Sequence, residues 1–448
     1  MDDWTKTMSV SAILNRIRNA AKTITSLLIS ILALGGSGFV FKSILNPQSV
    51  VIEQIYLPSV VEERGFKSEI LVHRILDEIQ TLKSVAKIER AESAIFGSLA
   101  SNPDANIDAQ VGGISIKSVE QIIASIFDKQ PRKISGEIIV LPGADKAVLQ
   151  ARLRLDNQVI SSREAPVGRD DLDALVRQMA FDLYRQFEPF RAALAAQRLG
   201  QIETARDTLR PIIISGDPED RKYALWLRST LSAQRQRELD LLEAVSIDSK
   251  FTLALVSLAA LERDRKNFEA SRAYADRVVE ADPKSPSGYH ERGRTLRAER
   301  RIDEAVKEFD QACSLPIEYA PCHNQLGEIL FQRADGVANP NEFFRKAYNE
   351  FVKTMKIDPR NAWAHSNAAY AAMSLGNLGD AQILILRAKE LDAKSPAHAI
   401  RYAAITYRLG NKDEARSTIL AILPSIPNWE DAPPDGWGNR SLIREVLK

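Results

Sequence analysis

The 448-residue sequence contains few of the residues that build metal or redox centres, with only two cysteines and five histidines. It also has almost no net charge, because 60 lysine and arginine residues offset 59 aspartate and glutamate residues. A near-neutral chain has no global electrostatic reason to bind nucleic acid, so we expect no nucleic-acid partner. The chain is 27% charged and 45% hydrophobic, which is an ordinary globular composition and long enough for two or three cores.

Motifs of catalysis are also missing from the sequence. There is no glycine-rich phosphate loop followed by lysine and serine or threonine, no HExxH, no GxSxG elbow and no cysteine and histidine cluster at zinc spacing. We therefore expect a protein that is not an enzyme and that holds neither a cofactor nor a metal ion.

One segment near the N-terminus has no charge at all. Residues 23–41 are predominantly apolar and would span about 28 Å as a helix, close to the hydrocarbon thickness of a bilayer. Basic residues precede this segment, and positive flanks stay on the cytoplasmic side. The pattern predicts a single-pass protein of a bacterial inner membrane, with residues 1–22 cytoplasmic, a transmembrane helix at 23–41 in the lipid bilayer, and the rest of the chain extracytoplasmic.

A cleaved signal peptide is the alternative, and it would give a secreted protein. Ala33, Gly35 and Ser37 supply small residues after an apolar stretch, as cleavage sites require. Against cleavage, the leader of 22 residues is long for a signal, and apolar residues resume at Phe39.

The next part of the chain, residues 42–187, mixes strands with amphipathic helices. Val50–Leu57 is rich in β-branched residues and precedes Pro58, which predicts a strand. The segment from Phe66 to Leu82 carries apolar residues at helical spacing. Ser118 and Gln121 form a capping-box start for a second helix.

A β-hairpin is predicted further along this region, after a strand at Gly136–Val140. Ala147–Leu155 alternates apolar with polar residues, which a sheet with one solvated face requires. Asp156 and Asn157 tolerate the left-handed backbone of a tight turn, so the following QVISS should return as the partner strand. We expect a small extracytoplasmic α+β domain.

From residue 188 onward the sequence repeats itself. The small residue expected in each second helix recurs with three intervals of 34 residues and one of 42, at Ser271, Ala305, Ala347, Ala381 and Ala415. A fixed period near 34 residues is typical of stacked helix pairs. The one longer interval places an insertion of eight residues at Arg333–Phe344, where we expect a lengthened turn.

Three segments of this region resemble tetratricopeptide repeats: LRAERRIDEAVKEFDQACSL, AAMSLGNLGDAQILILRAKELD and TYRLGNKDEARSTILAIL. Gly376 and Gly410 stand at the turn between the two helices, and Asp358-Pro359 closes a unit. The resemblance covers roughly residues 188–425 and implies a mostly α-helical tetratricopeptide solenoid of six to seven helix pairs. Residues 426–448 are predicted to cap it, with an amphipathic helix at Asn439–Lys448 and with Trp429 and Trp437 as packing anchors.

The resemblance also implies a protein-binding groove. In this family the first helices line the concave face, with repeat positions two, five, nine, twelve and thirteen pointing inward. Those positions hold His290, Arg294, Arg297, Asn324, Glu328, Phe331, Trp363, Tyr370, Met373, Ile400, Tyr407 and Arg408. Arginine and aromatic side chains are the ones that form binding hot spots.

Histidine and cysteine offer two further patterns. His290, His323, His365 and His398 occur one per repeat near the start of a first helix. Packed helices lie about 8 to 10 Å apart, so four such residues cannot converge on one ion, and we interpret them as packing residues. Cys313 and Cys322 are nine residues apart across a short connection, where both a disulfide and two free thiols remain open.

The sequence as a whole predicts a membrane-anchored scaffold or adaptor that binds another protein of the cell envelope in its groove. An alternative assigns ligand sensing or catalysis to the α+β domain, residues 50–165, presented by the solenoid. His73, Glu137, Arg152 and Arg154 are the polar residues to examine for that role. A third possibility is that the α+β domain forms a homo-oligomer.

Overall fold

A computed structural model describes residues 50–62, 67–86, 110–111, 114–115, 132–142, 148–166, 169–426 and 439–448 of the chain. The predicted N-terminal segment 1–22, the predicted membrane helix 23–41, the predicted helix from Ser118, Trp429 and Trp437 lie outside these residues. Within them, no helix has both the length and the apolar character that crossing a bilayer requires. The described chain divides into two compact units.

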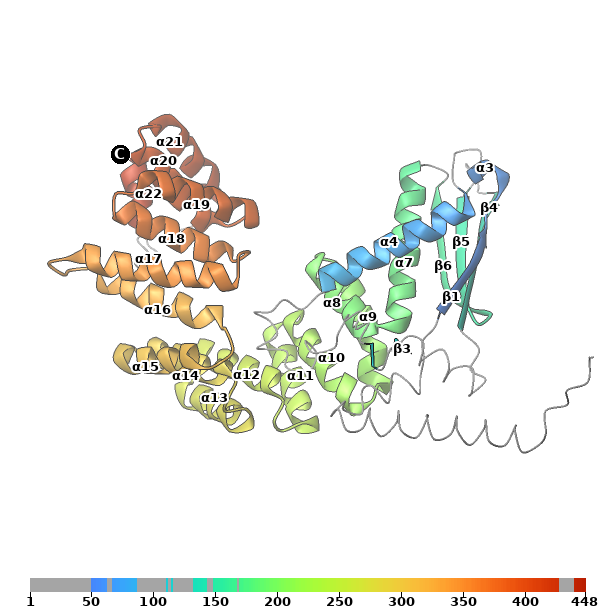
Figure 1. Cartoon of the computed structure of the whole chain (residues 1–448), viewed down its shortest axis with the longest axis horizontal. Helices are drawn as coiled ribbons and strands as arrows, with labels where there is room; N and C mark the ends of the chain where they lie inside the picture. The colour runs from blue at the N-terminus through green and yellow to red at the C-terminus, as the bar shows by residue number, and fades with distance from the viewer. Residues whose placement is uncertain are drawn as a thin grey trace, which may run out of the picture. The chain divides into compact units, whose positions relative to one another are not determined.

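The first unit is built on a four-stranded sheet with strand order β1-β4-β5-β6 (Figure 1). The strands are β1 (Val50–Tyr56), β4 (Arg132–Leu141), β5 (Val148–Leu155) and β6 (Gln158–Pro166). β1 runs parallel to β4, and the other neighbours pair antiparallel. A separate two-stranded pair joins β2 (Gln110–Val111) to β3 (Ile114–Ser115). The predicted α+β architecture of this region is therefore confirmed.

The β5–β6 hairpin forms as the alternation and the turn residues predict. Asp156 and Asn157 both have positive φ, 49° and 70°, which is the backbone of a two-residue turn that matches strand twist. The apolar side of β5 is buried at Leu149, Ala151, Leu153 and Leu155. One polar residue departs from the pattern, because Gln150 is also buried and donates a hydrogen bond of 2.8 Å to Glu164 on β6.

Two helices cover the apolar face of the sheet. These are α4 (Ser68–Ala86) and α7 (Arg169–Phe187), while a short α3 (Ser59–Glu62) follows β1. Leu71 and Ile75 of α4 and Leu175 and Met179 of α7 join the β-strand residues in one core. Hydrogen bonds connect α7 to the edge strand β6. The buried carboxylate of Asp182 in α7 accepts hydrogen bonds of 2.7 Å from Ser161 and Arg163 of β6.

In the second unit, the described residues from 189 onward form seven helix pairs followed by a single helix, stacked one after another (Figure 1). The first helices of the pairs are α8 (Pro189–Arg198), α10 (Pro218–Thr230), α12 (Thr252–Asp264), α14 (Pro286–Ala298), α16 (Ala320–Arg333), α18 (Ala362–Ser374) and α20 (Pro396–Arg408). The second helices are α9 (Ile202–Ser215), α11 (Gln234–Ile247), α13 (Phe268–Ala281), α15 (Ile302–Ser314), α17 (Pro340–Ile357), α19 (Leu378–Leu391) and α21 (Lys412–Ile422). This arrangement confirms the prediction of tetratricopeptide-like helix pairs.

The five small residues that define the period are all completely buried where the two helices of a pair cross. Ser271 stands where the other pairs have alanine, and its hydroxyl lies 2.8 Å from the Ala259 carbonyl oxygen and 2.7 Å from Oγ1 of Thr295. A buried hydroxyl with both bonds made is tolerated at this site, which explains the departure from alanine.

The insertion near residue 333 lengthens the turn, as the repeat spacing predicts, because six residues separate α16 from α17 whereas three separate α14 from α15. α17 begins at Pro340 and has 18 residues, whereas α15 has 13, so part of the inserted sequence extends the second helix by one turn. Proline is favoured in the first turn of a helix, where its missing N–H has no partner to lose. Phe344, the residue of α17 that follows this extension, packs against Phe331 of α16 with ring centroids 4.9 Å apart.

The last helix, α22 (Asn439–Leu447), covers the end of the stack. Its apolar residues Leu442, Ile443 and Val446 are buried in one core with Ile405 of α20 and Ile419 of α21. A solenoid needs such a cover, because its last pair has no neighbour to bury its apolar face.

Two neighbouring pairs, α14–α15 and α16–α17, share a contact between a glycine and a phenylalanine. A Cβ added to Gly327 in α16 would lie 2.6 Å from Cε1 of Phe351 in α17, and Gly293 meets Phe309 in the preceding pair in the same way. We expect Gly327→Ala to destabilise the solenoid by about 1 to 3 kcal/mol, since overpacking forces side chains or backbone to shift. Urea unfolding of the full chain followed by helical circular dichroism measures this change.

Gly379→Ala is the matched control, because Gly379 lies in α19 and a Cβ added there would meet open space. That replacement is expected to leave the unfolding midpoint unchanged or to raise it slightly, since alanine favours helix over glycine. If Gly327→Ala and Gly379→Ala had the same urea unfolding midpoint, the contact between Gly327 and Phe351 would not limit how closely α16 and α17 pack.

Candidate protein-binding face of the solenoid

The side of the solenoid formed by the first helices is its inner side. Consecutive first helices touch, as α12 does with α14, α16 with α18 and α18 with α20. Consecutive second helices make no contact of similar extent within residues 189–426. In a stack of helix pairs, the side whose helices approach each other is the concave one. The predicted groove residues therefore belong to the inner side.

Four of the residues expected to line the groove are instead buried: His290, Phe331, Met373 and Ile400. Neighbouring elements cover these positions, the next first helix in the case of Phe331, and the second helix of the pair with the following connection in the case of His290. Phe331 stacks on Tyr370 of α18 with ring centroids 4.7 Å apart. The ring of His290 packs against Tyr319 and Phe309.

The other predicted groove residues keep part of their surface. Trp363 is the most prominent, with 48% of its surface exposed. The partly exposed or exposed remainder comprises Arg294, Arg297, Asn324, Glu328, Tyr370, Tyr407 and Arg408. Arg408 forms an ion pair with Glu445 of α22, with Nε 3.0 Å from the carboxylate. These residues are accessible to a partner, and their role in binding stays a prediction.

Trp363 is held in place by two residues of the next first helix. Its indole meets the ring of His398 edge to face, with centroids 4.8 Å apart. The guanidinium of Arg401 lies 5.9 Å from the indole centroid and 5.4 Å from that of Tyr370. Contacts with a cation and with a second ring fix the orientation of an aromatic side chain before a partner binds.

A second set of inner-face residues was not predicted from the sequence. One repeat position, the sixth of each first helix, carries a polar residue in four consecutive pairs, and we call this set the first-helix polar row: Glu291, Gln325, Asn367 and Arg401. Three of its members are buried. The sequence does show a polar residue that recurs at this repeat position and could have indicated the row. The position is not, however, among the five that the family resemblance assigns to the groove.

Hydrogen bonds run from helix to helix through two members of the row, Arg401 and Asn367, and continue through Asn324 and Glu328 beside it. Arg401 of α20 donates to Asn367 of α18 at 2.7 Å, and Asn367 donates to Asn324 of α16 at 3.3 Å. Asn324 donates to Glu328, which also accepts from Arg297 of α14 at 2.6 Å. The bonds run across four first helices, so they fix the register of each helix against the next.

A buried ion pair continues the row toward the N-terminus. Arg263 of α12 donates to Glu291 of α14, and both side chains are buried. Burial acts to raise the pKa of Glu291, but hydrogen bonding to His290 and the charges of Arg294 and Arg263 outweigh it, so that its pKa falls to about 2. Burial lowers the pKa of His290 itself, which keeps that imidazole neutral near pH 7.

Acid should weaken the solenoid through this carboxylate. Because the pKa of folded Glu291 is depressed from 4.5, its contribution to stability is present above that value and is lost as the pH falls toward 2. We expect Glu291→Gln to reduce the fall in unfolding free energy between pH 5 and pH 3 by roughly 2 kcal/mol relative to wild type. Urea unfolding at the two pH values provides the comparison.

Glu280→Gln serves as the control for that experiment, since Glu280 is an exposed residue of α13. Its acid-induced loss of stability should match that of the wild type. If the unfolding free energy of Glu291→Gln fell between pH 5 and pH 3 by as much as that of the wild type, this result would contradict the depressed pKa of Glu291.

Two of the four repeat histidines behave as packing residues, as predicted: His290 and His398 are buried. His365 lies with Nε2 3.0 Å from the carbonyl oxygen of Pro359 in its own connection. His323 differs from these, because its Nδ1 lies 2.8 Å from the carboxylate of Glu350 in α17 and 3.6 Å from the sulfur of Cys313. Cys313 and Cys322 form a disulfide, with Cα atoms 5.7 Å apart.

The polar residues proposed for a second role of the α+β domain do not all come together. Glu137 of β4 pairs with Arg154 at 2.7 Å and with Arg152 at 3.6 Å, both on the neighbouring strand β5. These side chains lie on the face opposite the core, as the buried positions Ile138 and Leu153 show. His73 is an exposed residue of α4, which packs on the other face, so the structure separates it from these three.

Comparison with known proteins finds no family model and no curated protein that matches the chain. Among solved structures, a tetratricopeptide repeat protein of Thermus thermophilus is 16% identical at a TM-score of 0.36, over 44% of this chain and 98% of that one. PilF of Pseudomonas aeruginosa is 14% identical at a TM-score of 0.35, over 55% and 94%. A tetratricopeptide repeat protein of Parabacteroides merdae is 13% identical at a TM-score of 0.38, over 59% and 99%. A likeness this weak carries no conclusion about partner or activity.

Proposed function

We propose that this protein is a scaffold that binds a segment of another protein along the inner, first-helix face of its solenoid. The observation that carries the proposal is the exposed indole of Trp363 on that face, oriented by His398 and Arg401. A large exposed aromatic side chain with a fixed orientation is a typical hot spot for protein binding.

The first-helix polar row supports the same function. Its hydrogen bonds hold neighbouring helices in register, so the surface above it exists before a partner binds. A preformed surface loses little conformational entropy on association, which leaves more of the contact energy as affinity. Partly exposed Arg294 and Tyr370, each three residues after a member of the row, extend this surface.

Site-specific photo-crosslinking tests whether the inner face binds the partner. A photoreactive phenylalanine analogue replaces Trp363 in the full-length protein, which is produced in its native host and irradiated in intact cells. The expected result is a crosslinked adduct with one or a few distinct proteins. Unlabelled Trp363→Ala protein should lose those proteins on co-purification, by tenfold or more, since truncating a hot spot costs about 2 kcal/mol or more.

The same probe at Ile383 is the control, because Ile383 is 70% exposed on second helix α19 and thus on the opposite side of its pair. Identical adducts from both positions, or adducts from Ile383 alone, would place binding elsewhere than on the inner face.

We further propose that residues 23–41 anchor this scaffold in a bacterial inner membrane, with the solenoid on the extracytoplasmic side. The support is the uncharged, apolar composition of that segment and the basic residues before it. A tethered solenoid meets envelope partners at a raised effective concentration.

A reporter fusion tests this orientation. Alkaline phosphatase, which gains activity only where its disulfides form, is expected to be active when fused after Lys448 and inactive when fused after Lys22. An inactive fusion after Lys448, in cells where immunoblotting shows the full-length product, would invert the proposed topology. Release of the active fusion from membranes at a smaller mass would instead support the signal-peptide alternative.

A further inference from the structure

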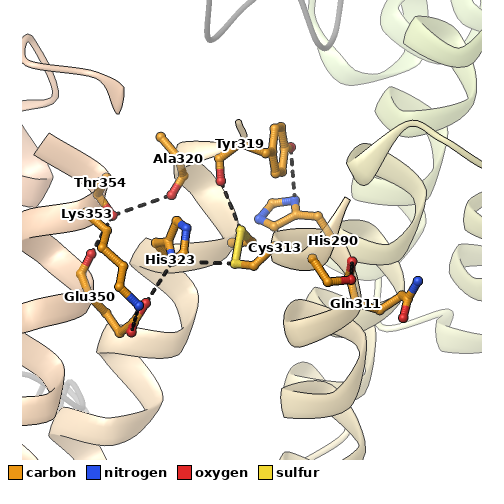
Figure 2. Close-up of a disulfide and its surroundings, with 11 residues drawn as sticks. His290, Gln311, Cys313, Tyr319, Ala320, His323, Glu350, Lys353 and Thr354 are labelled. Carbon is orange, nitrogen blue, oxygen red and sulfur yellow. Dashed lines mark hydrogen bonds and ion pairs between the residues drawn. A yellow bond between two sulfur atoms is a disulfide. The ribbon is translucent and has the colours of Figure 1, made fainter. Parts of the chain in front are cut away.

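The connection between the fourth and fifth helix pairs gathers two sulfurs and an imidazole. Cys313 lies near the end of α15, and Cys322 and His323 lie in the first turn of α16, after a connection of five residues. Figure 2 shows the disulfide between the cysteines with the ring of His323 beside it. The sulfur atoms of Cys313 and Cys322 and a ring nitrogen of His323 all lie within 4.8 Å of one another.

The spacing of these atoms fits the ligand set of a tetrahedral metal ion. Zinc binds thiolate sulfur at about 2.3 Å and imidazole nitrogen at about 2.1 Å, which at a tetrahedral angle places the two ligand atoms about 3.6 Å apart. Nδ1 of His323 lies 3.6 Å from the sulfur of Cys313. One edge of the coordination tetrahedron is therefore already present, and two thiolates with one imidazole form a ligand set that zinc prefers.

We propose that the dithiol form of this protein binds Zn²⁺ through Cys313, Cys322 and His323, in place of the disulfide. The dithiol is present in the newly made chain before its cysteines are oxidised. It also forms when a dithiol reductant gives two electrons and two protons to the disulfide and is itself oxidised to a disulfide. Zinc then bonds to both sulfurs and to Nδ1 of the neutral imidazole, whose proton moves from Nδ1 to Nε2 through solvent, and the two thiol protons pass to solvent.

Glu350 of α17 supplies the fourth ligand. Its Oε2 lies 2.8 Å from Nδ1 of His323, on the side of the imidazole where the ion would bind, and its Oε1 pairs with Lys353 at 2.6 Å (Figure 2). Two ligand atoms of one tetrahedral zinc ion lie about 3.3 Å apart when they are nitrogen and oxygen, so the carboxylate has to move by about 0.5 Å.

Burial favours a stable site at this place. Cys322 is completely buried, and Cys313, His323 and Glu350 are partly buried. The ligands come from three consecutive helices, α15, α16 and α17. Both the disulfide and the metal would therefore hold the same joint of the solenoid closed, one in oxidising and the other in reducing surroundings.

Cobalt binding to the full-length protein tests the proposal. Tag-free protein in detergent is reduced with a phosphine under argon, freed of reductant and titrated with Co²⁺. We expect one equivalent of Co²⁺ to produce the visible d–d bands of tetrahedral cobalt together with sulfur-to-cobalt charge transfer, and Zn²⁺ to abolish both. The oxidised protein should show neither signal, since its sulfurs are bonded to each other.

Variants separate the ligands from their surroundings. His323→Gln and Cys313→Ser should each weaken Co²⁺ binding at least tenfold, while helical circular dichroism reports whether the variant still folds. Glu350→Gln should weaken binding by about 10-fold to 100-fold, because an uncharged amide is a poorer ligand. His365→Gln, which alters the histidine of the next first helix, should bind as the wild type does.

Two results would overturn the proposal. One is reduced wild-type protein that retains its helical signal but shows no tetrahedral cobalt spectrum. The other is a folded His323→Gln variant that binds Co²⁺ as tightly as the wild type, which would leave the sulfurs alone as adventitious ligands.

Discussion

The close crossing of two helices within each pair is the contact on which the solenoid depends. Completely buried small residues, such as Ala305 and Ala381, let the backbones approach, and glycines at 293 and 327 leave room for a phenylalanine ring from the second helix. Each pair then has an apolar flank that it cannot cover alone, so it must stack on a neighbour. α22 ends this requirement by burying Leu442 and Ile443 against the last pair.

Stacking brings polar residues together as well as apolar ones. The inner face carries a buried cation, Arg401, which donates to the uncharged side chains of Ser366 and Asn367, and a buried ion pair between Arg263 and Glu291. Apolar residues at such positions often give equal or greater stability, so these polar contacts are better explained by the register they impose on neighbouring helices than by the energy they add. A fixed register is what keeps the aromatic side chains of the inner face oriented for a partner.

The joint between α15 and α16 differs in chemistry from the other connections of the solenoid. Both cysteines of the chain meet there, next to His323 and Glu350. A covalent link or a metal ion at a single joint restrains two neighbouring pairs, and with them the inner-face residues that those pairs contribute. The proposed binding face spans this joint, since Arg297 of α14 bonds to Glu328 of α16 across it.

The sequence by itself determined the helix pairs, their period, the β5–β6 hairpin and the capping helix, because each follows from residues within one repeat or one turn. Asp156 and Asn157 specify their turn locally, and the small residues recur at a period that only helix pairs explain. Tertiary structure alone decided that Met373 and His290 are buried, that Asn367 and Arg401 join across helices, and that His323 meets the cysteines. These outcomes depend on how closely one pair packs on the next, and the distances between pairs are set by all the side chains at their contact rather than by any local pattern.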